Sequence, residues 1–282
     1  MMQEYKFDMH VHTKETSSCG QVSAKELVRM YHDVGYQGIM ITDHYHKSYF
    51  DSLGSIDTEE KVKRYLSGYY AAKEEGDKIG LDVILGIEFR NIESDDDFLI
   101  VGMTEEFLYQ YPYMYELQLK EAIELFHKND MLVIQAHPVR FAVMEKTNGK
   151  IGRKRTSNEM LELWKMHPEM TVLYQDEWKK IQMENRENEI RLPFILRVCE
   201  LKCEDFLDGI EVYNGNIGWA QKPDEIKKIL EKHPSYRKVS ASDFHEKIHL
   251  ARGGMIFNKR VKDSKELKEL LLDDSMKAWI QH

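Results

Sequence analysis

Short apolar runs alternate with longer amphipathic stretches along most of the chain. The runs that predict strands lie at 5–11, 38–42, 82–88, 98–103, 131–136, 209–213 and 238–242. Apolar strands of this kind are typical of a parallel sheet that helices cover on both faces. The number of strand and helix units in 282 residues favours a closed (β/α) barrel over an open sheet.

Helix signals fill the intervals between these strands. Ser23 and Glu26 form a capping box that opens the first helix, and Gly35 follows as its C-terminal stop. The polar pattern from about 58 to 78 predicts one long helix that ends before Gly80. Further helices are predicted at 114–128, from Pro223 onwards and at 264–272.

One segment interrupts this alternation. Residues 141–192 show no clear strand pattern, and a gap of this length in a βα series predicts an insertion rather than a loop. We interpret this insertion as mainly helical and place it inside a single domain that covers residues 1–282. Residues 146–155 carry five basic side chains, which indicate either a solvated turn or a lid over an anionic substrate.

Composition narrows the classes of function. The net charge is −9, 32% of the residues are charged, and no apolar run is long enough to span a bilayer. Three cysteines are too few for a disulfide framework and indicate a reducing compartment. We therefore expect a cytoplasmic protein with no membrane or nucleic-acid partner, and twelve histidines remain to be explained.

Metal-ligating residue types gather where the predicted strands end. His10 and His12 close the first strand and point to the same side, because they are two residues apart. The other candidates at strand ends are His44, Glu88, His137, Asp243 and His245. In a parallel barrel these ends converge on one face, where active sites are built. Imidazole and carboxylate groups together suit Zn²⁺, Mn²⁺ or Fe²⁺.

Each candidate also has a simpler explanation when it is taken alone. A single His-x-His occurs by chance, Asp43 and His44 could form a turn, and Glu88 could pair with Arg90. These explanations would all have to hold in one fold-consistent order. The joint pattern therefore favours a shared metal cluster.

The ordered set of motifs resembles the PHP (polymerase and histidinol phosphatase) superfamily. The set reads His-x-His at 10–12, Thr-Asp-His at 42–44, Gly-Ile-Glu at 86–88, Ala-His-Pro at 136–138 and Ser-Asp-x-His at 242–245. It spans the chain from His10 to about Arg252, apart from the insertion. The resemblance implies a distorted (β/α)7 barrel of TIM-like type, with two or three divalent metal ions (Zn, Mn or Fe) at its C-terminal face.

The resemblance also implies three groups of metal ligands, two of which share Glu88. The groups are His10, His12, Glu88 and Asp243 for the first ion, Glu88 and His137 for the second, and His44 and His245 for the third.

Two positions depart from the family's pattern. Many members have a His or Asp six residues after the second His of the first motif, where this chain has Ser18. The neighbouring Cys19 could supply a thiolate instead, or could be a small residue in a turn. Many members also have a His where this chain has Leu99, so Asp96, Asp97 or water would have to complete the shell of the second ion. The number of filled sites is left open.

The resemblance implies a metal-dependent phosphoesterase that uses metal-activated hydroxide on a small phosphate ester, such as histidinol phosphate or a nucleotide. The sequence has neither a Gly-x-Ser-x-Gly nucleophile elbow nor a phosphate-binding P-loop. Arg140 and Arg252 are candidate phosphate-binding residues, although a turn contact would explain Arg252 equally well. Asp43 or His46 is the candidate donor of a proton to the leaving group.

Two other classes stay open. Metal-dependent amide or lactone hydrolases also use a barrel that begins with His-x-His. Their sites often need a lysine at a strand end, whereas this chain has Glu88 at the bridging position and no suitable lysine. A non-catalytic metal-binding barrel is the third class, which Leu99 makes conceivable. The oligomeric state is left open.

Overall fold

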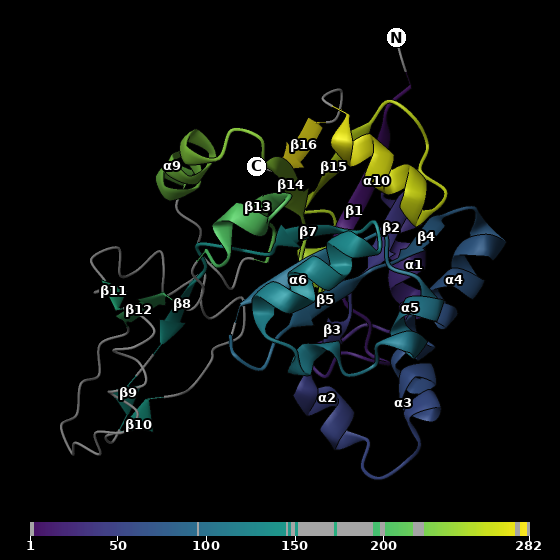
Figure 1. Ribbon diagram of the computed structural model, residues 1–282. Helices are drawn as coiled ribbons and strands as arrows, with labels where there is room; N and C mark the ends of the chain where they lie inside the picture. Colours follow the sequence, from purple (N-terminus) through teal and green to yellow (C-terminus); the bar gives the residue numbers. More distant parts are fainter. Residues whose placement is uncertain are drawn as a thin grey trace.

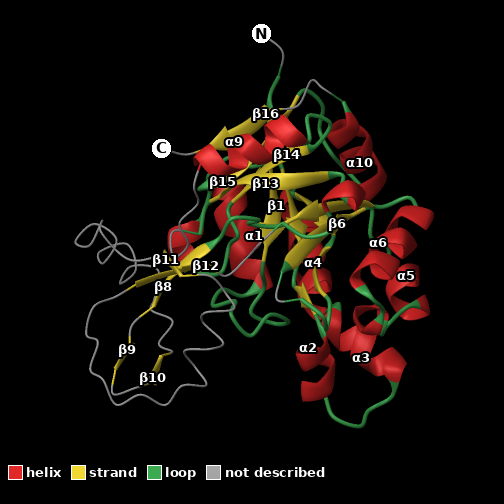
Figure 2. Ribbon diagram, turned by 60° about the vertical axis from the view of Figure 1, so that its left-hand side comes forward, coloured by secondary structure: helices red, strands yellow, loops and turns green. Residues whose placement is uncertain are grey.

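The apolar runs of the sequence become the strands of two sheets (Figures 1 and 2). The computed structural model describes residues 3–94, 96–144, 146–147, 150–151, 172–173, 194–197, 201–216, 223–273 and 277–280. The strands are β1 Tyr5–Val11, β2 Gly38–Ile41, β3 His44–Tyr45, β4 Asp82–Leu85, β5 Ile87–Arg90, β6 Asp97–Val101, β7 Leu132–Gln135, β13 Gly209–Asn214, β14 Arg237–Ala241, β15 Gly253–Phe257 and β16 Lys277–Ile280. One sheet has the order β16-β15-β1-β2-β4, and the other has the order β14-β13-β7-β6-β5-β3.

Several neighbouring strands are parallel, as the sequence predicts, but β6 is not. β1, β2 and β4 are mutually parallel, and β13 is parallel to both β7 and β14. β6 is antiparallel to β5 and to β7. β15 is also antiparallel to β1 and to β16, so the prediction of a wholly parallel sheet is wrong at both strands. For β6 the reason is the connection over residues 91–96, because a parallel crossover needs a dozen residues or more.

The two sheets are closely joined. Only residues 42–43 separate β2 from β3, and only Gly86 separates β4 from β5. Val11 forms a parallel bridge with Phe244, just beyond β14. One hydrophobic cluster contains buried side chains from seven strands of both sheets. The fold is therefore a mixed α/β fold, and closure of the described sheets into one (β/α)7 barrel stays a prediction.

Helices pack on these strands through their apolar faces. They are α1 Ala24–Asp33, α2 Lys47–Ser52, α3 Thr58–Tyr65, α4 Ser67–Ile79, α5 Glu105–Gln110, α6 Leu119–Lys128, α9 Pro223–Lys232 and α10 Ser264–Leu272, with short 3-10 helices at Met114–Glu116, Glu204–Phe206 and Lys247–His249. Figure 2 shows α3, α5 and α6 along one side of the strands. Ser23 caps α1 by accepting a hydrogen bond from the Glu26 N–H, as the sequence predicts. Within the described part of the chain, no helix has the length and apolar character that a membrane span requires.

The long helix predicted over 58–78 is two helices. The Thr16 side chain inserts at the break between α3 and α4, where its hydroxyl donates to the Tyr65 carbonyl and accepts from the Gly68 N–H. An inserted side chain of this kind interrupts the helical hydrogen-bond ladder. The break brings Gly68 against the loop that follows β1. A Cβ at this glycine would lie 2.9 Å from the Asp43 Oδ2 atom.

The described residues of the predicted insertion are all in short strands. These strands are β8 Phe141–Met144, β9 Lys146–Thr147, β10 Lys150–Ile151 and β11 Val172–Leu173. β8 and β11 each pair with β12, Phe194–Arg197. The expectation of a mainly helical insertion therefore finds no support in the described residues. The rest of 141–192, including most of the basic stretch, lies outside them.

Candidate metal centre

Four of the seven predicted metal ligands surround the buried carboxylate of a fifth, Glu88. Glu88 does not end a strand as predicted, because the strand breaks at Gly86 and Glu88 is the second residue of β5. Four imidazoles surround its carboxylate. The contacts are His10 Nε2 and His137 Nε2 to Oε1, at 3.2 and 3.1 Å, and His44 Nδ1 and His12 Nε2 to Oε2, at 2.6 and 3.3 Å. Burial raises the pKa of Glu88, but His44 and His10 outweigh it and hold that pKa well below its usual value.

Asp243 provides a second carboxylate beside the two β1 histidines. Its Oδ1 atom lies 3.4 Å from the Nε2 atoms of His10 and His12, and 3.2 Å from His245 Nδ1. The backbone at Asp243 has a φ of 50°, and that at His137 has a φ of 33°. Non-glycine residues in this left-handed region cost of order 1–3 kcal/mol each and concentrate at functional sites.

The donor atoms of this cluster fit a bound cation. Within the described residues, five buried atoms of the cluster itself make ion-pair contacts with one another but no hydrogen bond of good geometry: His10 Nε2, His12 Nε2, His44 Nδ1, Glu88 Oε2 and Asp243 Oδ1. Buried polar atoms normally have partners, and unsatisfied ones require an explanation such as a missing ion. Imidazole nitrogens and carboxylate oxygens around one point are the donors that Zn²⁺, Mn²⁺ or Fe²⁺ accepts. The residues present therefore fit the divalent cations that the sequence implies.

Glu211, on β13, orients two of these ligands and was not anticipated from the sequence. Its Oε1 atom accepts from His10 Nδ1 at 2.8 Å, and its Oε2 atom accepts from the backbone N–H of His137 at 2.8 Å. With Nδ1 donating, the Nε2 atom of His10 is left to bind a cation. The available signal was an acidic residue in the middle of a strand whose neighbours are apolar, since Glu211 is fully buried.

Asp97 lies where the sequence leaves the second site incomplete. Leu99 is fully buried in the shared hydrophobic cluster and cannot ligate, as predicted. Donor atoms of Asp97, His44 and Glu88 lie within 4.8 Å of one another. The Asp97 carboxylate also accepts two hydrogen bonds from Arg90, both at 2.7 Å. Of the alternatives named for this shell, Asp97 is the one whose carboxylate joins the cluster.

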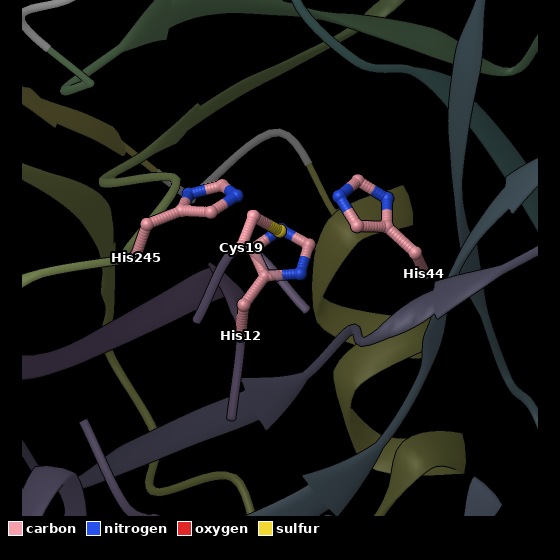
Figure 3. Close-up of side chains that lie close together, drawn as sticks. All are labelled: His12, Cys19, His44 and His245. Carbon is pink, nitrogen blue, oxygen red and sulfur yellow. The ribbon is translucent and has the colours of Figure 1, made fainter. Parts of the chain in front are cut away.

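Cys19 lies in a group of four potential ligands with His12, His44 and His245 (Figure 3). One donor atom from each lies within 4.8 Å of the others. Ser18, the position that the family pattern points to, is exposed. Burial raises the pKa of the Cys19 thiol, but hydrogen bonds to His245 and His44 outweigh it and lower that pKa to about 6.

The two predicted proton donors have other contacts. Both carboxylate oxygens of Asp43 accept hydrogen bonds from the loop after β1, at 2.7 Å from Thr13 and 2.6 Å from Ser17. Burial raises the pKa of Asp43 to about 6. The Nδ1 atom of His46 caps α2 by accepting from the Tyr49 N–H. Burial and the neighbouring His44 lower the pKa of His46 to about 4. In this arrangement Asp43 fixes the loop that carries Ser17. A role of Asp43 or His46 in proton transfer stays a prediction.

The two predicted arginines both lie near the cluster. Arg140 Nη1 is 2.9 Å from His137 Nε2, so its guanidinium lies against a predicted metal ligand. Arg252 packs over Gly215, directly after β13, where a Cβ would lie 2.6 Å from the Arg252 Cβ. The buried Nε atom of Arg252 has no hydrogen-bond partner among the described residues. Donors of this kind are suited to an anion.

Comparison with known proteins identifies the family of the chain. The model of the PHP domain family matches residues 8–178, which is more than half of the chain. Asp243 and His245 lie beyond the matched residues and join the site through the fold. No curated protein sequence matches the chain.

Two solved structures share the fold at low sequence identity. One is a two-domain protein from Bacteroides vulgatus ATCC 8482 that contains a predicted PHP-like metal-dependent phosphoesterase. It is 14% identical, has a TM-score of 0.55, and is matched over 99% of this chain and 65% of its own. The chain thus spans 65% of the length of that relative. The other is PsfC from Pseudomonas syringae PB-5123, which is 11% identical, with a TM-score of 0.52 and coverage of 99% and 93%. The chain belongs to the PHP domain family.

Proposed function

We propose that the chain is a metal-dependent phosphoesterase that hydrolyses a small-molecule phosphate ester. The observation that carries this proposal is the Glu88 carboxylate, which four imidazoles surround, together with Asp243, which contacts two of the same imidazoles. When bound at such a centre, divalent cations lower the pKa of coordinated water and offset charge on phosphoryl oxygens.

The protein's own residues would hold these cations in two groups. His10, His12, Glu88 and Asp243 supply one group of ligands, and His137, Asp97 and Glu88 supply the other. Zn²⁺, Mn²⁺ and Fe²⁺ are the ions that suit these donors. Glu211 fixes the ring of His10 through its hydrogen bond to Nδ1, so that Nε2 faces the cluster.

Arg140 and Arg252 supply positive charge beside the cluster. A guanidinium can donate two parallel hydrogen bonds to a phosphoryl group, which orients it as well as binding it. Arg140 is the stronger candidate, because its guanidinium lies 2.9 Å from the His137 ring. These contacts favour an anionic substrate over a neutral amide or lactone.

A metal-dependent phosphatase assay tests this proposal. The protein is analysed for bound metal and then screened against phosphomonoesters and phosphodiesters with added Mn²⁺ or Zn²⁺. Turnover should be lost on chelation and return with the metal. His12→Ala should lose turnover and bound metal, whereas the matched control His32→Ala, on the exposed face of α1, should keep both.

The same assay separates the other classes. Turnover of amides or lactones without turnover of phosphate esters would replace the proposal with the amidohydrolase alternative. A protein that binds metal but shows no metal-dependent rate on any ester would be a non-catalytic barrel. Full activity in His12→Ala would contradict the assignment of the centre.

A further inference from the structure

The loop between β1 and α1 carries Cys19 into the candidate metal centre. This loop is fixed by backbone hydrogen bonds, in which the Gly20 N–H donates to Ser17 O and the Gln21 N–H donates to His245 O. Gly20 also packs so closely that a Cβ there would lie 2.6 Å from the Thr13 carbonyl oxygen. Cys19 is therefore held against His245 by the same loop that Asp43 anchors.

Some histidines around Cys19 still have a ring nitrogen that can bind a cation after the ligands of the first ion are assigned. His12 belongs both to the group around Cys19 and to the group with His10 and Asp243. Its Nδ1 contacts Ser17 Oγ, so only Nε2 remains to bind a cation. That nitrogen lies within 3.4 Å of both Glu88 and Asp243, which places His12 with the first ion. His245 donates through Nδ1 to the Asp243 carbonyl oxygen at 2.9 Å, which leaves Nε2 available.

Figure 3 shows the Cys19 sulfur between the rings of His245 and His44. A sulfur and two imidazole nitrogens are three ligands of a tetrahedral site with one open position. Thiolate is a soft ligand that selects Zn²⁺ over Mn²⁺ or Mg²⁺, which prefer oxygen. His44 Nδ1 lies 2.6 Å from Glu88 Oε2, so the other ring nitrogen of His44 is the one left to bind a cation beside Cys19.

We propose that the Cys19 thiolate is a ligand of a third cation, which it binds together with His44 and His245, and that this site takes a thiophilic ion such as Zn²⁺. The inference rests on the proposed function, because it gives a further ligand to the third site that the resemblance implies in the same centre. Cys19 stands in for the His or Asp that the family pattern places one residue earlier, at the exposed Ser18. The centre would then combine one soft site with two sites rich in carboxylate.

Cobalt spectroscopy of the whole chain tests this assignment. The purified protein is stripped with a chelator and reconstituted with Co²⁺, whose bond to a thiolate gives a near-ultraviolet charge-transfer band. We expect the band in the wild type, its loss in Cys19→Ser, and its retention in Ser18→Ala and Cys203→Ser. Cys19→His should bind the third ion without the band, and circular dichroism checks that each variant folds.

Thiol protection gives a second readout that needs no variant. Native apoprotein is alkylated with iodoacetamide with and without Zn²⁺, and the labelled peptides are quantified by mass spectrometry. Zn²⁺ should protect Cys19 and leave Cys203, a half-buried thiol outside the cluster, unaffected. Mn²⁺ at the same concentration should protect Cys19 far less.

The outcomes distinguish this inference from the proposed function. Bound Co²⁺ without a thiolate band, or Cys19 alkylated equally with and without Zn²⁺, would overturn the third site and leave the rest of the centre standing. A chain that binds no Co²⁺ at all would overturn both. A band that persists in Cys19→Ser and disappears in Cys203→Ser would show that Cys203 supplies the thiolate, and would refute the inference.

Discussion

Replacing Glu211 with glutamine should lower both the stability of the fold and the affinity of the centre for metal. The two Glu211 oxygens accept from His10 Nδ1, from the His137 N–H and from Asn214 Nδ2, at 2.8, 2.8 and 3.0 Å. In Glu211→Gln, keeping the bond from His10 places an amide NH₂ against the other two donors. Asn214 cannot flip without cost, because its Oδ1 accepts from the Asn216 N–H.

Two buried donors would then lack an acceptor, at about 1–3 kcal/mol each, so the free energy of unfolding should fall by about 2–6 kcal/mol. If the amide turns the other way, it meets His10 Nδ1 and favours the tautomer whose Nε2 carries the proton and cannot ligate. Loss of a partner behind a ligand typically weakens metal binding ~10–100-fold. Urea unfolding of the metal-free protein measures the loss of stability. Competition with a chromophoric chelator measures the loss of metal affinity.

The matched control is Glu75→Gln. Glu75 is also buried, but it pairs with Arg29 between α4 and α1, away from the centre. This variant should keep the metal affinity of the wild type. If Glu211→Gln binds metal as tightly as Glu75→Gln does, then Glu211 does not orient the ligands and the reasoning above is refuted.

Three further substitutions probe the supports of the site. Tyr31→Phe removes a hydroxyl that donates to Asp8 at 2.8 Å. The free energy of unfolding in urea should fall by about 1–3 kcal/mol, while the amount of bound metal stays unchanged. A loss of bound metal would contradict this prediction. Gly68→Ala drives a Cβ into the Thr13 hydroxyl and should displace the loop after β1, so that dialysed protein retains less metal; full retention would show that the loop tolerates the shift. Asp97→Asn should lower the number of ions bound per chain in calorimetric titration, and wild-type stoichiometry would exclude Asp97 as a ligand.

Much of the strand and helix pattern could be predicted because burial leaves a strong periodic signal. The strand Tyr5–Val11 and the helix Ser264–Leu272 were predicted with the bounds that the structure has. The direction of β6 could not be predicted from its composition, since apolar runs look alike in parallel and antiparallel strands. The length of the preceding connection was the usable signal. The break near Leu66 depends on Thr16, whose contact with that helix exists only in the folded chain.

The candidate ligands could be identified from the sequence because each lies in or just after an apolar run and has a residue type that binds metal; their binding of metal stays a prediction. Glu211 was missed because its signal is an acid inside a strand, which sequence alone does not distinguish from an exposed position. The contact of Cys19 with His245 joins residues far apart in the chain. No local pattern could have shown whether Cys19 faces the centre or the solvent.

The bridge between Val11 and Phe244 has a consequence for how the protein is made. It places His10 and His12, which emerge early in translation, beside Asp243 and His245, which emerge late. A ribosome-bound chain that has not yet reached residue 245 holds the first half of the centre without the second. For the proposed metal centre, the complete set of ligands is therefore present only after synthesis has passed that point.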